Sequence, residues 1–397
     1  MKKLLLACVA MLAVACSSGD DSTPVNNPDP VAGCDNVFNG DVVLSTQEEV
    51  NAFASHGYCE ITGSLTIQSL NTEHQILGIQ QLSSLKKIGG SLIIRNNLLL
   101  PSLKGLDNVE EISTCVYVED NTALTNFEGL AVLQKLGDPA KFGFPIDSGD
   151  PLSPEYPGKL IVRRNQGLKS LEGLGSVVNL NRLDIKNNTS LLNLKGLEHL
   201  NKVASVVDIA NNVSLLTLQG LDNIQSATTV SLSGNASLVS IEALSNLSEI
   251  NEFGVSSHAS LQNLKGLENL HKVNKLTLFS NSGLTTLEGL QNLTNAGNIM
   301  ISSNSSLGSL HHLNNLQSID GGTGSTGFMI EYNPMLHSLE GLEGLTYVYG
   351  IFFIQHNAAL TDFCAISALI LSQQSYSLFG NGYDPDSSDF IAGNCSH

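Results

Sequence analysis

Apolar residues recur along this chain with a period of about 23 residues, and the recurrence is clearest when counted from the asparagine of an N-x-x-L motif. A fixed period of this length is typical of solenoid proteins, in which each repeat forms one coil and stacks on its neighbours. The repetition therefore predicts one elongated unit from residue 61 to residue 363. The anchor positions are Asn97, Asn121, Asn165, Asn188, Asn212, Asn235, His258, Asn281, Asn304, Asn333 and Asn357.

Each position within the repeat has a physical task. Before Asn188, Leu183 and Ile185 flank the polar Asp184, which is the alternation of a strand with one buried face. Leu stands three residues after every anchor, and Gly stands eight after it in eight of the eleven coils, where the backbone must turn or approach a neighbour closely. The anchor itself suits a left-handed turn residue whose amide bonds the neighbouring coil. With so little helical signal, we predict an all-β solenoid, a right-handed β-helix of about twelve coils whose first, irregular strand covers residues 65–67.

The repeated pattern resembles a known family. A strand such as "GSLII", the turn "NN" and then "LxSLxGLxNVxxI" are similar to the receptor L-domain, a leucine-rich-repeat-like β-helix that also occurs in surface lipoproteins of Bacteroidetes-type bacteria. The resemblance covers roughly residues 59–363, and "FGNGYDPDSSDFIAGNCS" resembles the closing segment of such bacterial proteins. It implies a binding role. In receptors that contain this domain, two L-domains are separated by cysteine-rich modules. This sequence lacks such modules, so the resemblance does not imply receptor signalling.

The N-terminus predicts export. Residues 1–15 combine two lysines with a short apolar run, and "AVAC" resembles a lipobox in which Cys16 receives lipid. A plain secretory signal is the alternative, since "AVA" also fits its cleavage site. Residues 16–33 are rich in Pro, Asp and Ser and predict a flexible tether. We therefore expect a lipid-anchored outer-membrane protein exposed at the cell surface, with the membrane contacted through the anchor alone.

Both ends of the solenoid are predicted to carry caps. Residues 34–60 include a capping box at Ser45 and Glu48 and a helix through about Ala54, and residues 364–397 form the C-terminal cap. Two cysteines lie before the repeats and two after them, which predicts two disulfides that hold the ends in place. The leftover Cys115 begins a strand and is either a buried inert thiol or a reactive one. The predicted pairs are Cys34 with Cys59 and Cys364 with Cys395.

Charge narrows the class of partner. The formal net charge is -18, and loss of the signal with two of the 19 basic residues leaves 17 against 37 acidic ones, or -20. Such a chain is unsuited to nucleic acid. Basic residues nevertheless gather on the outward side of neighbouring strands, and an insertion at 137–158 adds aromatic side chains beside them. These are candidate ligand-binding residues for an anionic glycan or an acidic protein surface: Arg95, Lys159, Arg163, Arg164, Arg182, Lys186, Phe142, Phe144 and Tyr156. The alternative for the basic residues is a ladder of charge pairs with Glu119, Asp184 and Asp208. The alternative for the insertion is that its aromatic side chains fold back over the sheet edge and are structural.

Catalytic and metal chemistry find little support in the residues. Asp184 and Asp208 lie one strand apart, about 5 Å, which is the separation of a retaining glycosidase pair, but no third group or aromatic residue accompanies them. Asp384, Asp386 and Asp389 resemble a calcium loop only superficially, and capping of a short helix by Asp386 or Ser387 explains them. We expect no cofactor and no metal site.

These observations favour a non-catalytic binding or adhesion module for protein or glycan ligands. One alternative is a structural stalk without a discrete site. A second alternative is a polysaccharide-degrading β-helix enzyme, which the fold permits because β-helices also support that chemistry.

Overall fold

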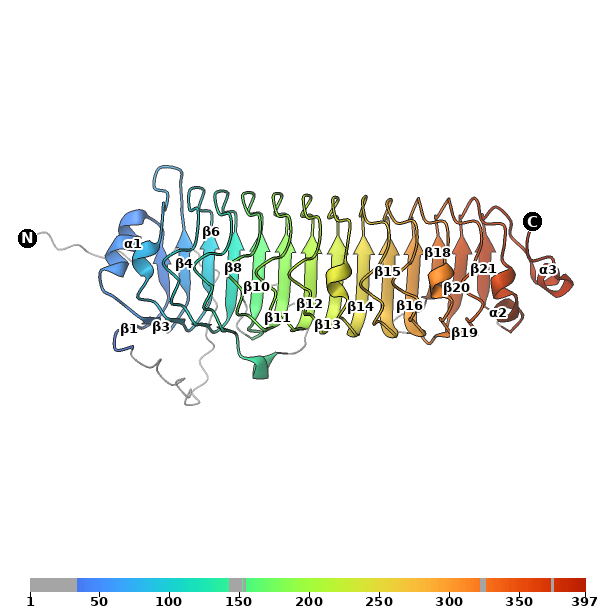
Figure 1. The fold of residues 1–397 in the computed structure, drawn as a ribbon, viewed down its shortest axis with the longest axis horizontal. Coiled ribbons are helices and arrows are strands. Elements are labelled where there is room, and N and C mark those ends of the chain that lie inside the picture. The colour runs from blue at the N-terminus through green and yellow to red at the C-terminus, as the bar shows by residue number, and fades with distance from the viewer. Residues whose placement is uncertain (1–33, 143–151, 153–154, 322–325, 373–374) are drawn as a thin grey trace, which may run out of the picture.

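The computed structural model describes residues 34–142, 152, 155–321, 326–372 and 375–397, and it is an elongated solenoid (Figure 1). Helix α1 lies at one end and helices α2 and α3 lie at the other, with strands stacked side by side between them. Each coil places its strand parallel to the strand of the next coil. The all-β solenoid expected from the repeats is confirmed.

Among the described residues, the strands of the coils run in chain order along the main sheet. The strands are β1 (Val37–Phe38), β2 (Val42–Leu44), β3 (Glu60–Ile61), β4 (Leu65–Gln68), β5 (Lys87–Ile88), β6 (Leu92–Arg95), β7 (Glu111–Ile112), β8 (Cys115–Glu119), β9 (Lys135–Leu136), β10 (Lys159–Arg163), β11 (Asn179–Lys186), β12 (Lys202–Ala210), β13 (Ser226–Ser233), β14 (Glu249–Ser256), β15 (Lys272–Phe279), β16 (Asn295–Ser302), β17 (Ser318–Ile319), β18 (Thr326–Glu331), β19 (Tyr347–Val348), β20 (Ile351–Gln355) and β21 (Tyr376–Phe379).

Helices are short and lie at the ends of the solenoid or at corners of its coils. The α-helices are α1 (Gln47–Ala54), α2 (Ser367–Ser372) and α3 (Ser387–Ala392). The 3₁₀ helices are η1 (Gln80–Leu82), η2 (Pro139–Lys141), η3 (Glu242–Leu244), η4 (His311–Leu313) and η5 (Cys364–Ile366).

The main sheet follows the path β2-β4-β6-β8-β10 to β16, then β18-β20-β21, which is fourteen strands and therefore about fourteen coils rather than twelve. The additional strands β2 and β21 come from the segments expected to be caps. Strands β1, β3, β5, β7 and β9 form a second small sheet. Strands β11–β16 are eight or nine residues long. The first residues of each long strand correspond in the repeat to the separate short strand, such as β7 or β9, of an earlier coil.

The core is a set of apolar ladders along the solenoid. Leu183 and Ile185 are fully buried, and so is the Leu three residues after every anchor, from Leu100 to Leu360. These side chains belong to one continuous cluster that extends from Val42 to Phe390. The expected inward positions are therefore confirmed, and each coil buries its apolar face only by stacking on its neighbours.

The anchor asparagines form a buried hydrogen-bonded ladder. The backbone N–H of Asn188 donates to Asn212 Oδ1 at 2.9 Å, and Asn212 Nδ2 donates to the carbonyl of Ile185 in the preceding coil at 2.8 Å. The same pair of bonds recurs along the chain and ends at Asn381, where Asn357 donates its N–H to Asn381 Oδ1. Each anchor amide thus bonds both an N–H and a carbonyl of the preceding coil, so the side chain joins its own coil to that neighbour, as expected.

The left-handed residue is not the anchor but the residue before it. Asn96, Asn187 and Asn211 have φ between +57° and +59°, and the same position in other coils is held by Ser257, Ser280 or Tyr332 with φ between +55° and +60°. The prediction that the anchor itself takes this conformation was wrong. The preceding residue makes the turn, and this leaves the anchor side chain directed into the core, where the amide is needed.

Glycine eight residues after an anchor makes the close backbone approach that the sequence indicates. Gly196 has φ of +108°, and a Cβ there would collide with the carbonyl of Leu171 in the preceding coil. Three coils have Ala243, His312 or Ala365 instead, and each of these residues lies in a 3₁₀ helix, η3, η4 or η5. A residue with a side chain avoids the positive φ by taking this tighter helical turn.

The ends are closed as the cysteine count predicts. Disulfides join Cys34 to Cys59 and Cys364 to Cys395, and Cys115 carries a buried thiol on β8. The N-cap of α1 is Thr46, not Ser45, because Thr46 Oγ1 accepts from the N–H of Glu49, whose carboxylate accepts from the N–H of Ser45. At the other end the chain turns back, and Ser396 bridges Asp362 in antiparallel fashion.

His258 is the one anchor of the eleven that is not asparagine, and its pH dependence is testable. Burial lowers the pKa of His258 from 6.5 to about 4, while Asn281 Oδ1 lies 3.2 Å from its Nδ1. The unfolded chain therefore binds a proton at His258 more readily than the folded chain does. As a result, the free energy of unfolding is at its full value above pH 6.5 and decreases as the pH falls toward 4. The loss is about 3 kcal/mol.

We expect His258→Asn to remove this loss, because an amide does not titrate in this range and restores the repeating bond pattern. Urea unfolding at pH 7 and at pH 4.5 measures it, with the exposed His271→Asn as the matched control. Equal pH dependence of wild type and His258→Asn would contradict the assignment.

Candidate functional site

Leu152, from the insertion after β9, covers part of the outward face of the main sheet. Leu152 packs against a small cluster of Cys115, Tyr117 and Ile161, which are at most 8% exposed although they lie in or beside the row expected to face outward. The segment also carries η2, which projects from the regular coils (Figure 1). The sequence left two possibilities open for this insertion, a recognition loop or a segment that folds back on the sheet. The contacts of Leu152 are those of a segment that folds back.

The aromatic residues predicted to form a recognition loop have different surroundings. Phe142 is half-buried, and its ring occupies the space beside the α-carbon of Gly158. Tyr156 is also half-buried. Phe144 lies outside the described residues, so its predicted role stays a prediction.

The basic residues predicted to bind a ligand lie on or directly after β10 and on β11, except Arg95 on β6, which β8 separates from β10, and most of them contact acids. Arg164 forms a two-pronged bond with Asp120 at 2.8 and 2.9 Å and an ion pair with Glu119 at 2.9 Å. Arg95 Nε donates to Gln68 Oε1 at 2.8 Å, and Lys159 is 6% exposed. Their role in ligand binding stays a prediction.

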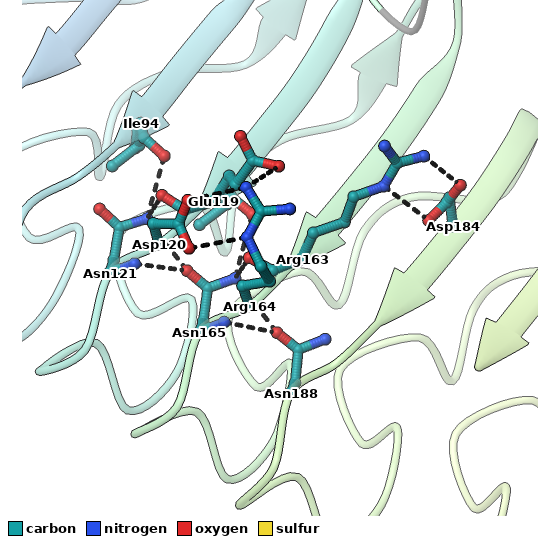
Figure 2. A network of polar contacts seen from close by, with 10 residues as sticks. Ile94, Glu119, Asp120, Asn121, Arg163, Arg164, Asn165, Asp184 and Asn188 are labelled. Atoms are coloured by element: carbon teal, nitrogen blue, oxygen red, sulfur yellow. Dashed lines mark hydrogen bonds and ion pairs between the residues drawn. The ribbon is translucent and has the colours of Figure 1, made fainter. Parts of the chain in front are cut away.

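Asp184 contacts three of these bases, and Figure 2 shows its pair of bonds with Arg163. Its carboxylate is fully buried and accepts two bonds from Arg163, at 3.0 Å from Nε and 2.6 Å from Nη2. Arg182 and Lys186 approach the same carboxylate at 3.4 and 3.5 Å, and Lys186 also pairs with Asp208. The charge ladder that the sequence offered as an alternative is therefore present in the structure.

The cluster also determines the protonation of Asp184. Burial alone would raise the pKa of this carboxyl, but the hydrogen bonds from Arg163 and the charges of Arg163, Lys186 and Arg182 hold it below its ordinary value. A glycosidase acid must keep its proton near neutral pH. The lowered pKa therefore disfavours Asp184 as the general acid of the retaining pair that its spacing from Asp208 suggests.

Pairing limits the positive charge that the cluster presents. The four bases Arg163, Arg164, Arg182 and Lys186 face the four acids Glu119, Asp120, Asp184 and Asp208. The bridged groups sum to about zero charge. An anionic ligand would have to displace acids that already satisfy these bases, which is costly for charges that are partly buried.

The sequence did not indicate a shallow groove that the structure shows next to the insertion. Its volume is about 600 Å³, and it lies across the first residues of the long strands β12 to β15, with the ring of Phe142 at its β11 side. The lining residues are Phe142, Lys202, Val203, Ala204, Ser226, Ala227, Thr228, Ser248, Glu249, Ile250, Asn251, Lys272, Val273 and Asn274.

The groove arises from small side chains at a bend in the sheet. Strand β12 has one residue more than its neighbours here, so Ala204 and Ser205 together lie opposite the single residue Thr228 of β13. Such a bulge bends a strand and increases its twist. The sequence carries two signs of this bulge, the 24-residue gap between Asn188 and Asn212 and the small residues around 204 and 228. Neither can be interpreted until the pairing register of β12 with its neighbouring strands is known.

The acidic C-terminal segment has a structural explanation. Asp386 caps α3 and forms a capping box with Asp389, while Asp384 accepts bonds from the N–H groups of Gly380 and Asn381. The capping role expected for Asp386 is confirmed. Within the described ranges, no three His, Cys, Asp or Glu side chains gather as a metal site would require, and no helix is long and apolar enough for a membrane span.

Among the comparisons with known proteins, a family model matches the first coils of the solenoid. Residues 59–143, which is 85 of the 397 residues, match the family model of the receptor L domain. No curated protein matches the chain. Among solved structures, the chain is similar to a crystal structure of a TLR13–ssRNA13 complex, with 12% sequence identity, coverage of 90% of this chain and 74% of that chain, and a TM-score of 0.22.

We expect Asp184→Asn to destabilise the protein by about 3 kcal/mol at neutral pH, because it leaves partly buried bases without their acceptor. Since the pKa of Asp184 is lowered on folding, its stabilising contribution is present above about pH 4 and is lost as the pH falls below that value. The difference between variant and wild type should therefore shrink in acid. Denaturant unfolding at pH 7 and pH 3 measures it.

The matched control is Glu288→Gln, which removes an exposed pair with Lys265 at 3.2 Å. An exposed pair contributes at most about 1 kcal/mol. A loss for Asp184→Asn no larger than that of the control would contradict a central role for Asp184.

Proposed function

We propose that this protein is a surface-displayed lipoprotein whose solenoid binds protein or glycan ligands without catalysis. The observation that carries the proposal is the groove of about 600 Å³ on β12–β15, which Phe142 of the insertion at 137–158 borders. Insertions in repeat proteins map to loops, and loops placed on a rigid scaffold commonly carry recognition. The receptor L-domain match of the first coils adds support for a binding role.

The form of the groove favours a large ligand. It is open along one side and runs across four neighbouring coils, whereas a site for a small metabolite encloses most of its ligand. Its lining mixes hydroxyl, amide and charged side chains with the apolar rows of the sheet. An elongated ligand that lies across several coils can contact this lining without being enclosed.

A stalk without a discrete site is the second candidate. The buried asparagine ladder and the two disulfides support it, because they give a rigid rod with closed ends whether or not a ligand binds. The stalk accounts for the regular coils, but it assigns no role to the groove.

The proposed anchor is tested by Cys16→Ser. We expect the variant to lose lipid labelling and to move from the outer-membrane fraction to the soluble exported fraction, because Cys16 is the proposed acceptor. Cys8→Ser, inside the proposed signal peptide, is the matched control and should behave as wild type. Unchanged membrane fractionation of Cys16→Ser would contradict the anchor.

The binding role is tested by presenting the purified protein to a panel of glycans and extracellular-matrix proteins at low and moderate salt. We expect retention of at least one ligand class. Binding that persists at moderate salt would support contact through hydrogen bonds and apolar surface, whereas salt-sensitive binding would implicate the basic residues of β10 and β11. A panel on which nothing is retained would favour the stalk.

A further inference from the structure

The outward side chains of the groove form a column along the solenoid axis. Successive strands place Ala204, Thr228, Asn251 and Asn274 at equivalent positions, next to an inward row of Val203, Ala227, Ile250 and Val273, in which Ile250 is half-buried and the other three are buried. Asn181 of β11 lies next to this column, on the far side of Ala204. The column is thus rich in amide and hydroxyl groups.

These amides have hydrogen-bonding capacity to spare. Asn274 Nδ2 donates to Asn251 Oδ1, and within the part of the chain that the structure describes, Asn251 Nδ2 and Asn274 Oδ1 make no further side-chain bond. Asn181 is 2% exposed, and its Oδ1 is a buried acceptor without a hydrogen-bond partner among the described residues. An unsatisfied buried acceptor destabilises the folded chain, in contrast to the anchor amides, whose donor and acceptor are both bonded.

The spacing of the column selects the kind of polymer that fits it. Adjacent coils are about 4.8 Å apart, whereas an extended peptide repeats its side-chain pattern every two residues, or about 6.6 Å. A peptide lying along the axis would therefore lose register with the column after one or two coils. A linear chain of pyranose rings advances by a length close to one coil spacing per sugar, so one ring can lie over each coil and offer a hydroxyl group to it.

The charge of the rim points to a neutral chain. Lys202, Glu249 and Lys272 are exposed along the same four strands, and their alternating signs would attract neither an anionic nor a cationic polymer strongly. Phe142 presents an aromatic ring at the β11 side. Apolar ring faces that stack on aromatic side chains, together with hydroxyls that bond amides, are the chemistry of a neutral sugar.

We propose that this groove binds a linear neutral glycan along the solenoid axis, with one sugar unit for each coil. The inference rests on the proposed binding function and makes it specific. Thr228, Asn251 and Asn274 contact the hydroxyl groups, and Phe142 packs against a ring at the end of the bound segment.

The test uses the full chain and neutral β-linked oligosaccharides of two, four and six hexose units, with affinity measured by calorimetry. We expect affinity to rise up to four units and then level off, since the groove spans four coils. Thr228→Tyr fills the column and should weaken binding about tenfold or more. Asn251→Ala combined with Asn274→Ala should also weaken it, while melting temperatures confirm that each variant is folded.

The matched control is Thr277→Tyr, which makes the same substitution on β15 outside the groove and should leave affinity within about twofold. Equal affinity of Thr228→Tyr and wild type, or the absence of any oligosaccharide binding, would overturn the inference. If a protein or peptide ligand from the broader panel is retained independently of Thr228, the proposed function stands and the glycan site does not. If neither set of probes is retained, both fail.

Discussion

The buried turn that follows each strand has to satisfy its backbone groups without water, and the anchor asparagines do this for the whole solenoid. An amide has both a donor and an acceptor, so one side chain can satisfy an N–H and a carbonyl of the preceding coil at the same time. An unsatisfied buried group would cost about 1–3 kcal/mol, and the cost would recur in every coil. The stacking distance, the register and the position of the leucine rows all depend on this repeated bond.

Most of the fold could be predicted because the ladder and the core impose the same residue at the same position in every coil. The left-handed turn could not be placed correctly, since the residue that takes it varies among Asn96, Arg164, Ser257 and Tyr332 and leaves no common signal. The two additional coils were missed for a related reason. Strands β2 and β21 have the geometry of the repeat without its full motif, although Asn381 continues the ladder.

The candidate sites show where sequence reasoning reaches its limit. The alternation of strand residues predicts that Asp184 faces outward, and it does, yet the arginine and lysine side chains around it leave the carboxylate fully buried. Whether a group of bases is a free patch or a satisfied network depends on distances between coils. The groove is harder still, because it needs the one-residue bulge at Ala204 and Ser205 and the approach of Phe142 from an insertion.

The C-terminal turn-back has a consequence for how the molecules behave when crowded together. A stack of parallel coils ends in an open ladder, and in principle a second copy can add to it and continue the stack. Here the bridge between Ser396 and Asp362 runs antiparallel, and the Cys364–Cys395 disulfide holds it in place. Antiparallel and parallel ladders space their hydrogen bonds differently, so the next coil of a second copy would find no matching edge there. A parallel strand of a second copy therefore cannot pair at Asp362, and end-to-end contact at this terminus is left to the edge of β21.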